Sequence, residues 1–350
     1  MAAKNKNPLT QDELVELLRA QAQRWLDWPN VTSVGVGPRL VNGQPTGELS
    51  IQVSVAEKIP DKKEIGRRGS MVLPRTLRAP DGRVAPVDVV ERSFRLSYEL
   101  VSGLSPFRSG EEMLPPRVRR RRRLTRLLPG VSISHPTVPA GTLGAIVYDQ
   151  KLGWPCVLSN AHVLVGANGK PGDVTLQPGS SDSADLARNE LGRLLRSHVG
   201  LAGDCAIASI ENRLFDETIF ELGVAPRRVA KVAVGDKVAK SGRTTGVTFG
   251  VVKRAGLVIR YDYGGATGKQ DIGGFEIQAD PAHPSSDGRL CDGGDSGAVW
   301  MIVENGQVTD VAAGLHFAQQ TDTATGVDFA LACNLHSVLE KLEVSFVRPA

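Results

Sequence analysis

The clearest chemical signal in the sequence is a serine set between glycines, in the run GGDSGAV at residues 293–299. Glycines on both sides of Ser296 let the backbone turn tightly and expose the hydroxyl. The backbone amides of Gly294 and Ser296 can then point at one spot, where a negatively charged oxygen would form. An acyl-transfer nucleophile requires this arrangement, and the simpler interpretation is a glycine-rich turn with a surface serine.

A serine hydroxyl is a poor nucleophile until a neighbouring base takes its proton. The chain has six histidines, and His162 follows an apolar strand and a small-residue turn in the run VLSNAHVL. A carboxylate must then accept from the other imidazole nitrogen, and Asp204 opens the apolar run GDCAIASI. We expect His162 to be the base and Asp204 to orient it. Taken alone, His162 also fits a core histidine, and Asp204 also fits a turn aspartate.

The order His, Asp, Ser and the spacings of 42 and 92 residues resemble those of the chymotrypsin-like (trypsin-fold) serine proteases. The runs LSNAHVL, GDCAIASI and GGDSGAVW are similar to that family's histidine, aspartate and nucleophile motifs. The run SGRTTG at 241–246 is similar to the strand and turn that open the second barrel in bacterial members. AGLHF, at 313–317, falls where the family's substrate-edge strand would lie. The resemblance covers about residues 130–342.

This resemblance implies a mainly β fold with two six-stranded antiparallel β-barrels and an active site in the crevice between them. It implies that Ser296 attacks a peptide carbonyl, that His162 moves the proton and that Asp204 orients the imidazole. The amides of Gly294 and Ser296 would form the oxyanion hole. This chemistry needs no cofactor and no metal. The runs VGVG at 34–37, GELSIQVSV at 47–55 and LQPG at 176–179 also resemble a subgroup of this family, the intracellular bacterial and plant trypsin-like proteins with an N-terminal extension.

The substrate pocket is less well defined by the sequence. Leu290, six residues before the nucleophile, would form its floor and offers no charge for a Lys or Arg side chain. An apolar or small substrate side chain is therefore expected, with Gly314, Leu315 and His316 lining the pocket. The GLHF run is also similar to the GIHW strand of glutamate-specific bacterial members. An acidic preference and a purely structural His316 both remain open.

The segment before the protease-like region has a different pattern. A helix is predicted from Gln11 to Trp25, because apolar residues recur there at spacings of three and four and Thr10 with Glu13 forms a capping box. Strand-like runs follow at 31–37, 48–55 and 84–90, with a turn at 42–43. We therefore expect a small α/β N-terminal domain, residues 1–101, that recruits or regulates.

From about residue 130 the sequence changes to short apolar runs separated by glycine, which is typical of a barrel or a sandwich. Residues 332–342 predict a closing helix. The predicted protease domain is 130–350, and residues 102–129 form an Arg-rich linker. The arginine run in that linker fits a solvated segment, a processing site, or contact with nucleic acid or the nuclear import machinery.

Composition narrows the class of protein further. The 350 residues are 41% hydrophobic and 23% charged, which excludes disordered, collagen-like and mini-protein classes. The net charge of +4 becomes −3 without the seven arginines of residues 117–126, so a nucleic-acid partner is not expected. No apolar run is long enough for a membrane helix, and the N-terminus does not resemble a signal peptide. These features predict a cytoplasmic protein that does not bind membranes.

The four cysteines are too widely spaced for a zinc ribbon and fit buried thiols in a reducing compartment. A disulfide between two of them is the alternative. Together, these features predict an intracellular serine endopeptidase that acts on a protein or peptide substrate. Two alternatives are a catalytically silent binding module and a latent enzyme that a regulatory partner completes through the N-terminal domain. The sequence leaves open whether cleavage near 126–130 creates a new N-terminus for Asp295, as in zymogens of this family.

Overall fold

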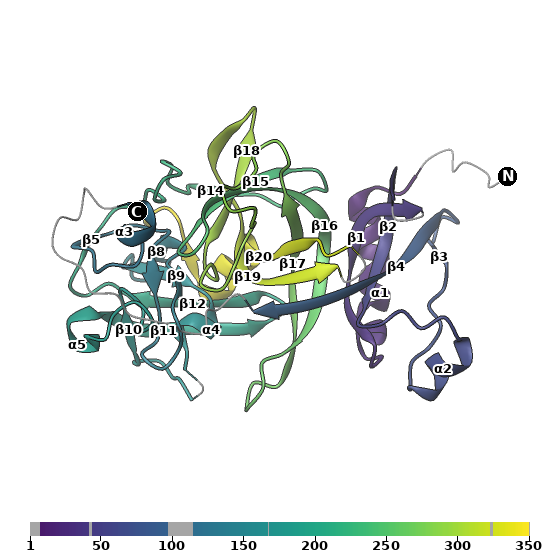
Figure 1. Ribbon diagram of the computed structural model, residues 1–350, viewed down its shortest axis with the longest axis horizontal. Coiled ribbons are helices and arrows are strands. Elements are labelled where there is room, and N and C mark those ends of the chain that lie inside the picture. The colour runs from purple at the N-terminus through teal and green to yellow at the C-terminus, as the bar shows by residue number, and fades with distance from the viewer. Residues whose placement is uncertain (1–7, 42–43, 97–114, 167, 323–324, 350) are drawn as a thin grey trace.

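The computed structural model describes residues 8–41, 44–96, 115–166, 168–322 and 325–349. Within these ranges the chain is mainly β, as expected, and most strands belong to two large sheets (Figure 1). The expected turn at 42–43 and the linker residues 102–114 lie outside the described residues.

The N-terminal unit consists of two helices and four strands: α1 (Gln11–Leu26), β1 (Val31–Val41), β2 (Gln44–Val55), α2 (Lys62–Arg67), β3 (Thr76–Arg78) and β4 (Val84–Leu96). The capping box is confirmed, because Thr10 accepts from the Glu13 backbone and Glu13 accepts from the Thr10 backbone. Helix α1 buries Leu14, Leu18 and Trp25 in an apolar cluster with the side chains of β1 and β2. These apolar contacts hold the helix on its sheet.

One large sheet has six strands in the order β10, β11, β12, β9, β8, β21. Their bounds are β8 (Ala145–Asp149), β9 (Pro155–Ser159), β10 (Val174–Leu176), β11 (Glu190–Gly200), β12 (Gly203–Ser209) and β21 (Val344–Ser345). Short helices α4 (Ala161–Leu164) and α5 (Leu186–Asn189) lie between these strands. The strand pairings follow a single path from β10 to β21, so the expected closed barrel is not confirmed here.

The other large sheet has eleven strands and includes both the N-terminal unit and the second half of the chain. Its C-terminal members are β14 (Arg228–Val229), β15 (Lys237–Gly242), β16 (Gly246–Asp262), β17 (Lys269–Ala279), β18 (Val299–Glu304), β19 (Gln307–Asp322) and β20 (Asp328–Asn334). Strands β15, β18, β19, β20, β17 and β16 each pair with the next, and β15 also pairs with β16. Helix α6 (Leu335–Leu342) begins later than the predicted 332, because residues 332–334 pair with neighbouring strands instead.

Two strand pairings join the N-terminal unit to the C-terminal region. Strand β1 pairs with β16, with Ser33 opposite Ile259, and β4 pairs with β19, from Leu96 opposite Ala318 to Arg92 opposite Asp322. Figure 1 shows β4 extending from the N-terminal unit toward β19. The division into 1–101, 102–129 and 130–350 stays a prediction, but the sheet itself runs across these boundaries.

Within the arginine run, Arg120 packs against the protein, whereas Arg117 and Arg126 are exposed. Arg120 is 1% exposed, donates to the Gly130 carbonyl at 2.7 Å and forms an ion pair with Glu221. The run and the segment that follows it contain four short elements: α3 (Pro116–Arg119), β5 (Arg126–Leu127), β6 (Ser132–Ile133) and β7 (Gly141–Thr142). Strand β5 pairs with β13 (Leu214–Phe215). A fully solvated linker is therefore the wrong description for Arg120.

All four cysteines are free and buried, so the alternative of a disulfide is wrong. No helix among the described residues combines the length and the apolar character needed to cross a bilayer.

Candidate active site

His162 and Asp204 meet at the end of the six-stranded sheet. His162 lies in α4, directly after β9, and Asp204 is the second residue of β12. The His162 Nδ1 atom is 2.5 Å from Asp204 Oδ2, and the His162 backbone N–H donates to Oδ1 at 3.2 Å. Asn160 donates to the Asp204 backbone carbonyl at 2.6 Å. Both the carboxylate and the imidazole are therefore held in one orientation.

The carboxyl of Asp204 is fully buried. Burial alone would raise its pKa, but the charge and hydrogen bond of His162, together with a hydrogen bond from Tyr263, outweigh burial and lower the pKa. The Tyr263 hydroxyl donates to Oδ2 at 2.8 Å, the oxygen that also faces His162. Asp204 is thus an ionised acceptor inside the protein, as an imidazole-orienting group must be.

Ser296 lies in the turn before β18 and is itself fully buried. Its backbone carbonyl accepts from the Thr142 N–H at 2.7 Å, and the Gly297 N–H donates to the His316 carbonyl at 2.8 Å. The Ser296 hydroxyl donates to the Phe317 carbonyl at 3.2 Å. The turn is therefore fixed between β7 of the first half and β19 of the second.

The same contacts bring the serine turn against the segment that carries His162. A Cβ atom on Gly141 would lie 2.8 Å from the Ser296 carbonyl and 2.5 Å from the Val163 side chain, which places both in one narrow space. A Cβ on Gly297 would lie 2.2 Å from Ser159 Oγ. Ser159 and Val163 lie close to His162 in the sequence, so the turn that bears Ser296 packs against the segment that carries His162.

Gly294 meets the conditions for an oxyanion donor. Its φ is +96°, and a Cβ there would lie 2.5 Å from both Arg243 Nη1 and Thr244 Oγ1, so the position accepts only glycine without strain. The Gly294 carbonyl accepts from Thr142 Oγ1 at 2.8 Å. Within the described ranges, its N–H donates to no protein acceptor.

Asp295, the residue before Ser296, has a buried counter-ion. Lys240 Nζ lies 3.2 Å from Asp295 Oδ2, and both side chains are fully buried. The Thr244 and Thr245 backbone N–H groups donate to Asp295 Oδ1, and the Thr245 hydroxyl donates to Oδ2 at 2.6 Å. Burial would raise the pKa of Asp295, but the charge of Lys240 and these hydrogen bonds lower it to about 2.

All four predicted pocket residues are buried. Leu290 is 4% exposed and belongs to an apolar cluster that includes Trp300, while Leu315 belongs to the larger cluster between the sheets. A Cβ on Gly314 would lie 2.5 Å from the Phe275 ring. Burial and the charge of Lys240 lower the pKa of the fully buried His316 to about 3, so its imidazole is neutral. Their assignment to a substrate pocket stays a prediction.

Two residues of the site were missed by sequence reasoning. Lys240 lies in the strand run VAKSG. A lysine between apolar and small residues indicates a buried charge, so the sequence could have pointed to it. Tyr263 has no such sign, because it is 59 residues from Asp204 in a hairpin of ordinary composition. No group of three or more His, Cys, Asp or Glu side chains suited to a metal occurs in the part of the chain that the structure describes.

No protein-family model and no curated protein matches the chain. Among solved structures, it is similar to Thermobifida fusca Protease A, with a TM-score of 0.44 and 17% identity over 63% of this chain and 97% of the other. A glutamic-acid-specific serine protease has a TM-score of 0.45 and 18% identity, over 62% of this chain and 98% of the other. A Nocardiopsis protease has a TM-score of 0.43 and 16% identity, over 63% of this chain and 98% of the other. All three are proteases, the class that the sequence motifs resemble. Each TM-score is below 0.5, so their activities are not transferred to this chain.

Proposed function

We propose that this protein is a serine endopeptidase in which Ser296, His162 and Asp204 form the catalytic triad. The observation that carries the proposal is the buried carboxylate of Asp204, which fixes His162 Nδ1 at 2.5 Å beside the turn that bears Ser296. A histidine held in this way presents its Nε2 atom, as a base, away from the carboxylate. A plain core histidine would not need an ionised partner of this kind.

The proposed reaction is an acyl transfer. Ser296 Oγ attacks the peptide carbonyl carbon while His162 Nε2 takes the hydroxyl proton, and the amides of Gly294 and Ser296 donate to the oxygen that becomes negative. The C–N bond then breaks and His162 returns the proton to the leaving amine. Water attacks the acyl-enzyme in the same way, which releases the acid and restores the serine. Asp204 stays ionised throughout.

The proposal includes control of the site by the N-terminal unit, and β4 supports this. Residues 314–321 of β19 pair with β20 on one edge, and residues 318–322 pair with β4 on the other. The β4 pairing begins at Ala318, next to Phe317, whose carbonyl accepts from Ser296. A peptide substrate commonly adds a strand to an exposed sheet edge. Because β4 holds this edge and Ser296 is buried, the described state favours a latent enzyme.

Activation through a new N-terminus is not required by the charges at the site. Such a terminus would supply a cation for Asp295, and Lys240 already does so from β15. We therefore propose that the latent and active states differ in whether a peptide can reach the edge of β19. They do not differ in the assembly of the oxyanion site.

For the substrate, we propose a peptide with an apolar or small side chain in the primary pocket. Leu290 supplies no charge, and the neutral, buried His316 does not attract a carboxylate by charge. A cytoplasmic location remains part of the proposal and rests on the sequence alone.

The test is labelling with a fluorophosphonate probe, which reacts with activated serines. Wild-type protein, His162→Ala and Ser296→Ala are compared before and after limited proteolysis that removes β4. Labelling that appears or accelerates after proteolysis, and that both substitutions abolish, supports a latent protease. Absence of labelling in every state, with peptide binding that survives Ser296→Ala, would favour the alternative of a silent binding module.

A further inference from the structure

Among the residues that the structure describes, the side chains that contact the Asp204 carboxylate are those of His162 and Tyr263. Both donors meet the same oxygen, Oδ2, while Oδ1 faces the His162 backbone. Two donors on one oxygen fix the rotation of the carboxyl about its Cβ–Cγ bond. The direction of that oxygen in turn sets the orientation of the imidazole ring.

The phenol is also suited to remain a donor. Burial and the negative charge of Asp204 raise the pKa of Tyr263 far above its ordinary value, so the hydroxyl keeps its proton. The Tyr263 backbone N–H donates to the Gly268 carbonyl at 3.0 Å, and its ring lies edge-on to Tyr261 with centroids 5.1 Å apart. These contacts hold the ring in place at the end of β16.

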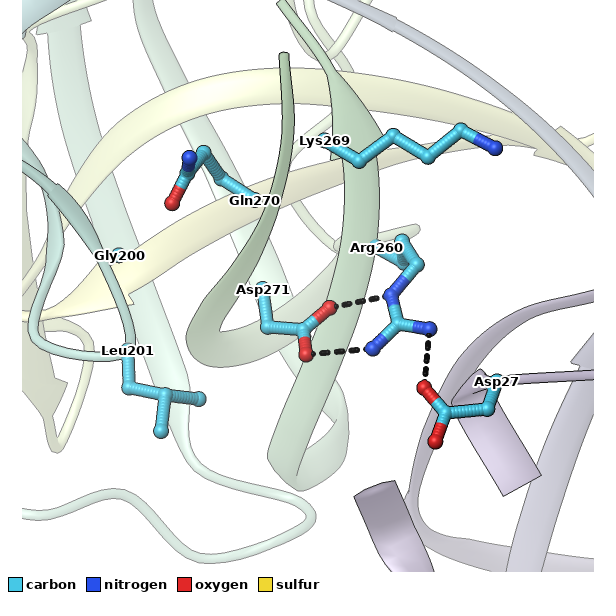
Figure 2. A pocket seen from close by; sticks show the side chains of 7 residues that line it. All are labelled: Asp27, Gly200, Leu201, Arg260, Lys269, Gln270 and Asp271. Carbon is cyan, nitrogen blue, oxygen red and sulfur yellow. Dashed lines mark hydrogen bonds and ion pairs between the residues drawn. The ribbon is translucent and has the colours of Figure 1, made fainter. Parts of the chain in front are cut away.

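Strand β16, which ends directly before Tyr263, is anchored to the N-terminal unit. Figure 2 shows Arg260 between two carboxylates, with Nε 2.7 Å from Asp271 and Nη1 2.8 Å from Asp27 at the end of α1. The same cavity is lined by Gly200 and Leu201, from the turn that precedes Asp204. The β16–β17 hairpin therefore contacts both the N-terminal unit and the strand of the triad acid.

We propose that Tyr263 is a positioning residue of the triad, which orients Asp204 and moderates the attraction between its carboxylate and His162. The inference rests on the proposed function, since orientation of Asp204 matters for catalysis only if His162 is the base. Without the phenol, the carboxylate loses a donor and attracts a protonated imidazole more strongly. The rotation of the carboxyl, and with it the orientation of the His162 ring, is then fixed less firmly.

Other titratable groups near this pair must be considered in a test that varies pH. His198, Cys205 and Cys333 interact electrostatically with Asp204, and His316 interacts with His162. Burial raises the pKa of both thiols and lowers the pKa of His198 and His316. The variants are therefore compared at equal pH, because each of them contains the same four additional titratable groups.

The experiment compares wild type with Tyr263→Phe and with Tyr148→Phe. The control removes a tyrosine hydroxyl that donates to Glu217, a carboxylate outside the triad. The fluorophosphonate labelling rate is measured against pH after removal of β4. For Tyr263→Phe we expect a plateau on the order of tenfold lower and an acid limb about one pH unit higher. Tyr148→Phe should reproduce the wild-type profile.

A second readout does not depend on activity. The proton between His162 Nδ1 and Asp204 gives a downfield NMR resonance, identified by its loss in His162→Ala. We expect this resonance to shift in folded Tyr263→Phe and to stay in place in Tyr148→Phe. An unchanged resonance and an unchanged pH profile would overturn the role of Tyr263. A wild-type protein that never labels would overturn the proposed function, while the resonance would still report on Tyr263.

Discussion

Lys240 and Asp295 form a fully buried ion pair, with Nζ 3.2 Å from Oδ2, directly before the proposed nucleophile in the sequence. Removing one partner of such a pair leaves an uncompensated charge in the interior. The carboxylate of Asp295 also accepts from the backbone of Thr244, Thr245 and Asp292. Asp295 therefore links the turn at Thr244 and Thr245 to the turn that precedes Ser296.

Lys240→Met should lower the free energy of unfolding by about 3–5 kcal/mol, because it strands the charge of Asp295. Labelling of Ser296 should fall with it, since the turn that carries the serine loses its anchor. Lys237→Met is the matched control, because Lys237 is on the same strand, is 47% exposed and pairs with Asp280. Urea unfolding should show a loss of less than about 1 kcal/mol for that variant. Equal losses in the two variants would contradict the role given to Lys240.

Gly294→Ala should reduce the labelling rate by roughly 10²–10³-fold, because a Cβ at this position displaces Arg243 or Thr244 and moves an oxyanion donor. Gly288→Ala controls for backbone strain, since Gly288 has a φ of +74° and no atom within 4 Å of the added Cβ. Gly288→Ala should lose about 1 kcal/mol of stability from the left-handed backbone. Gly294→Ala should lose more, because its Cβ also displaces a neighbouring side chain. The rate should fall only for Gly294→Ala, and a comparable fall in the control would refute the oxyanion assignment.

Arg92→Met should accelerate labelling of Ser296 about tenfold in the intact chain, since it weakens the pairing of β4 with β19 by about 1–3 kcal/mol. The Arg92 side chain is 6% exposed, forms an ion pair with Asp322 and lies 4.7 Å from the centroid of the Phe329 ring. Arg39→Met is the control, because Arg39 pairs with Glu48 in the same unit but is 41% exposed. Labelling kinetics that do not distinguish the two variants would argue against latency through β4.

His316 predicts a pH dependence of stability. Burial and the charge of Lys240 lower the pKa of His316 to about 3, whereas the unfolded chain takes up this proton near pH 6.5. The unfolded state therefore binds more protons between these values, and the free energy of unfolding should fall as the pH falls from 6.5. The slope from this one group is about 1.4 kcal/mol per pH unit. Urea unfolding from pH 7 to 4.5 should show a shallower slope in His316→Asn, and parallel slopes would contradict the prediction.

Local sequence patterns were sufficient for the elements whose signals are local. The capping box at Thr10 marks the start of α1, and the motif runs place His162, Asp204 and Ser296 at the ends of strands or in turns. The closing helix was predicted three residues too early, because residues 332–334 have helical spacing but pair with two strands. Tertiary pairing outweighs local propensity there.

The remaining features depend on contacts between distant segments. The pairing of Leu96 with Ala318 and the hydrogen bond from Tyr263 to Asp204 leave no pattern in either partner's own neighbourhood. The register between two strands depends on which of their faces pack together in the fold. The local sequence of either strand does not specify its distant partner. The residues of the proposed triad could be named from the sequence because the chemistry of acyl transfer limits the residue types that can perform it. The groups that support them could be supplied from many positions.

The long eleven-stranded sheet has a consequence for how the chain is made. Strands β1 and β4 leave the ribosome first, but their partners β16 and β19 are synthesised more than 200 residues later. Until then, both strands expose unpaired backbone edges that can join other chains. Pairings across such separations also form slowly. The nascent protein therefore passes through a period in which it depends on dilution or on chaperones to avoid aggregation, and shortening its C-terminus should leave its N-terminal half insoluble.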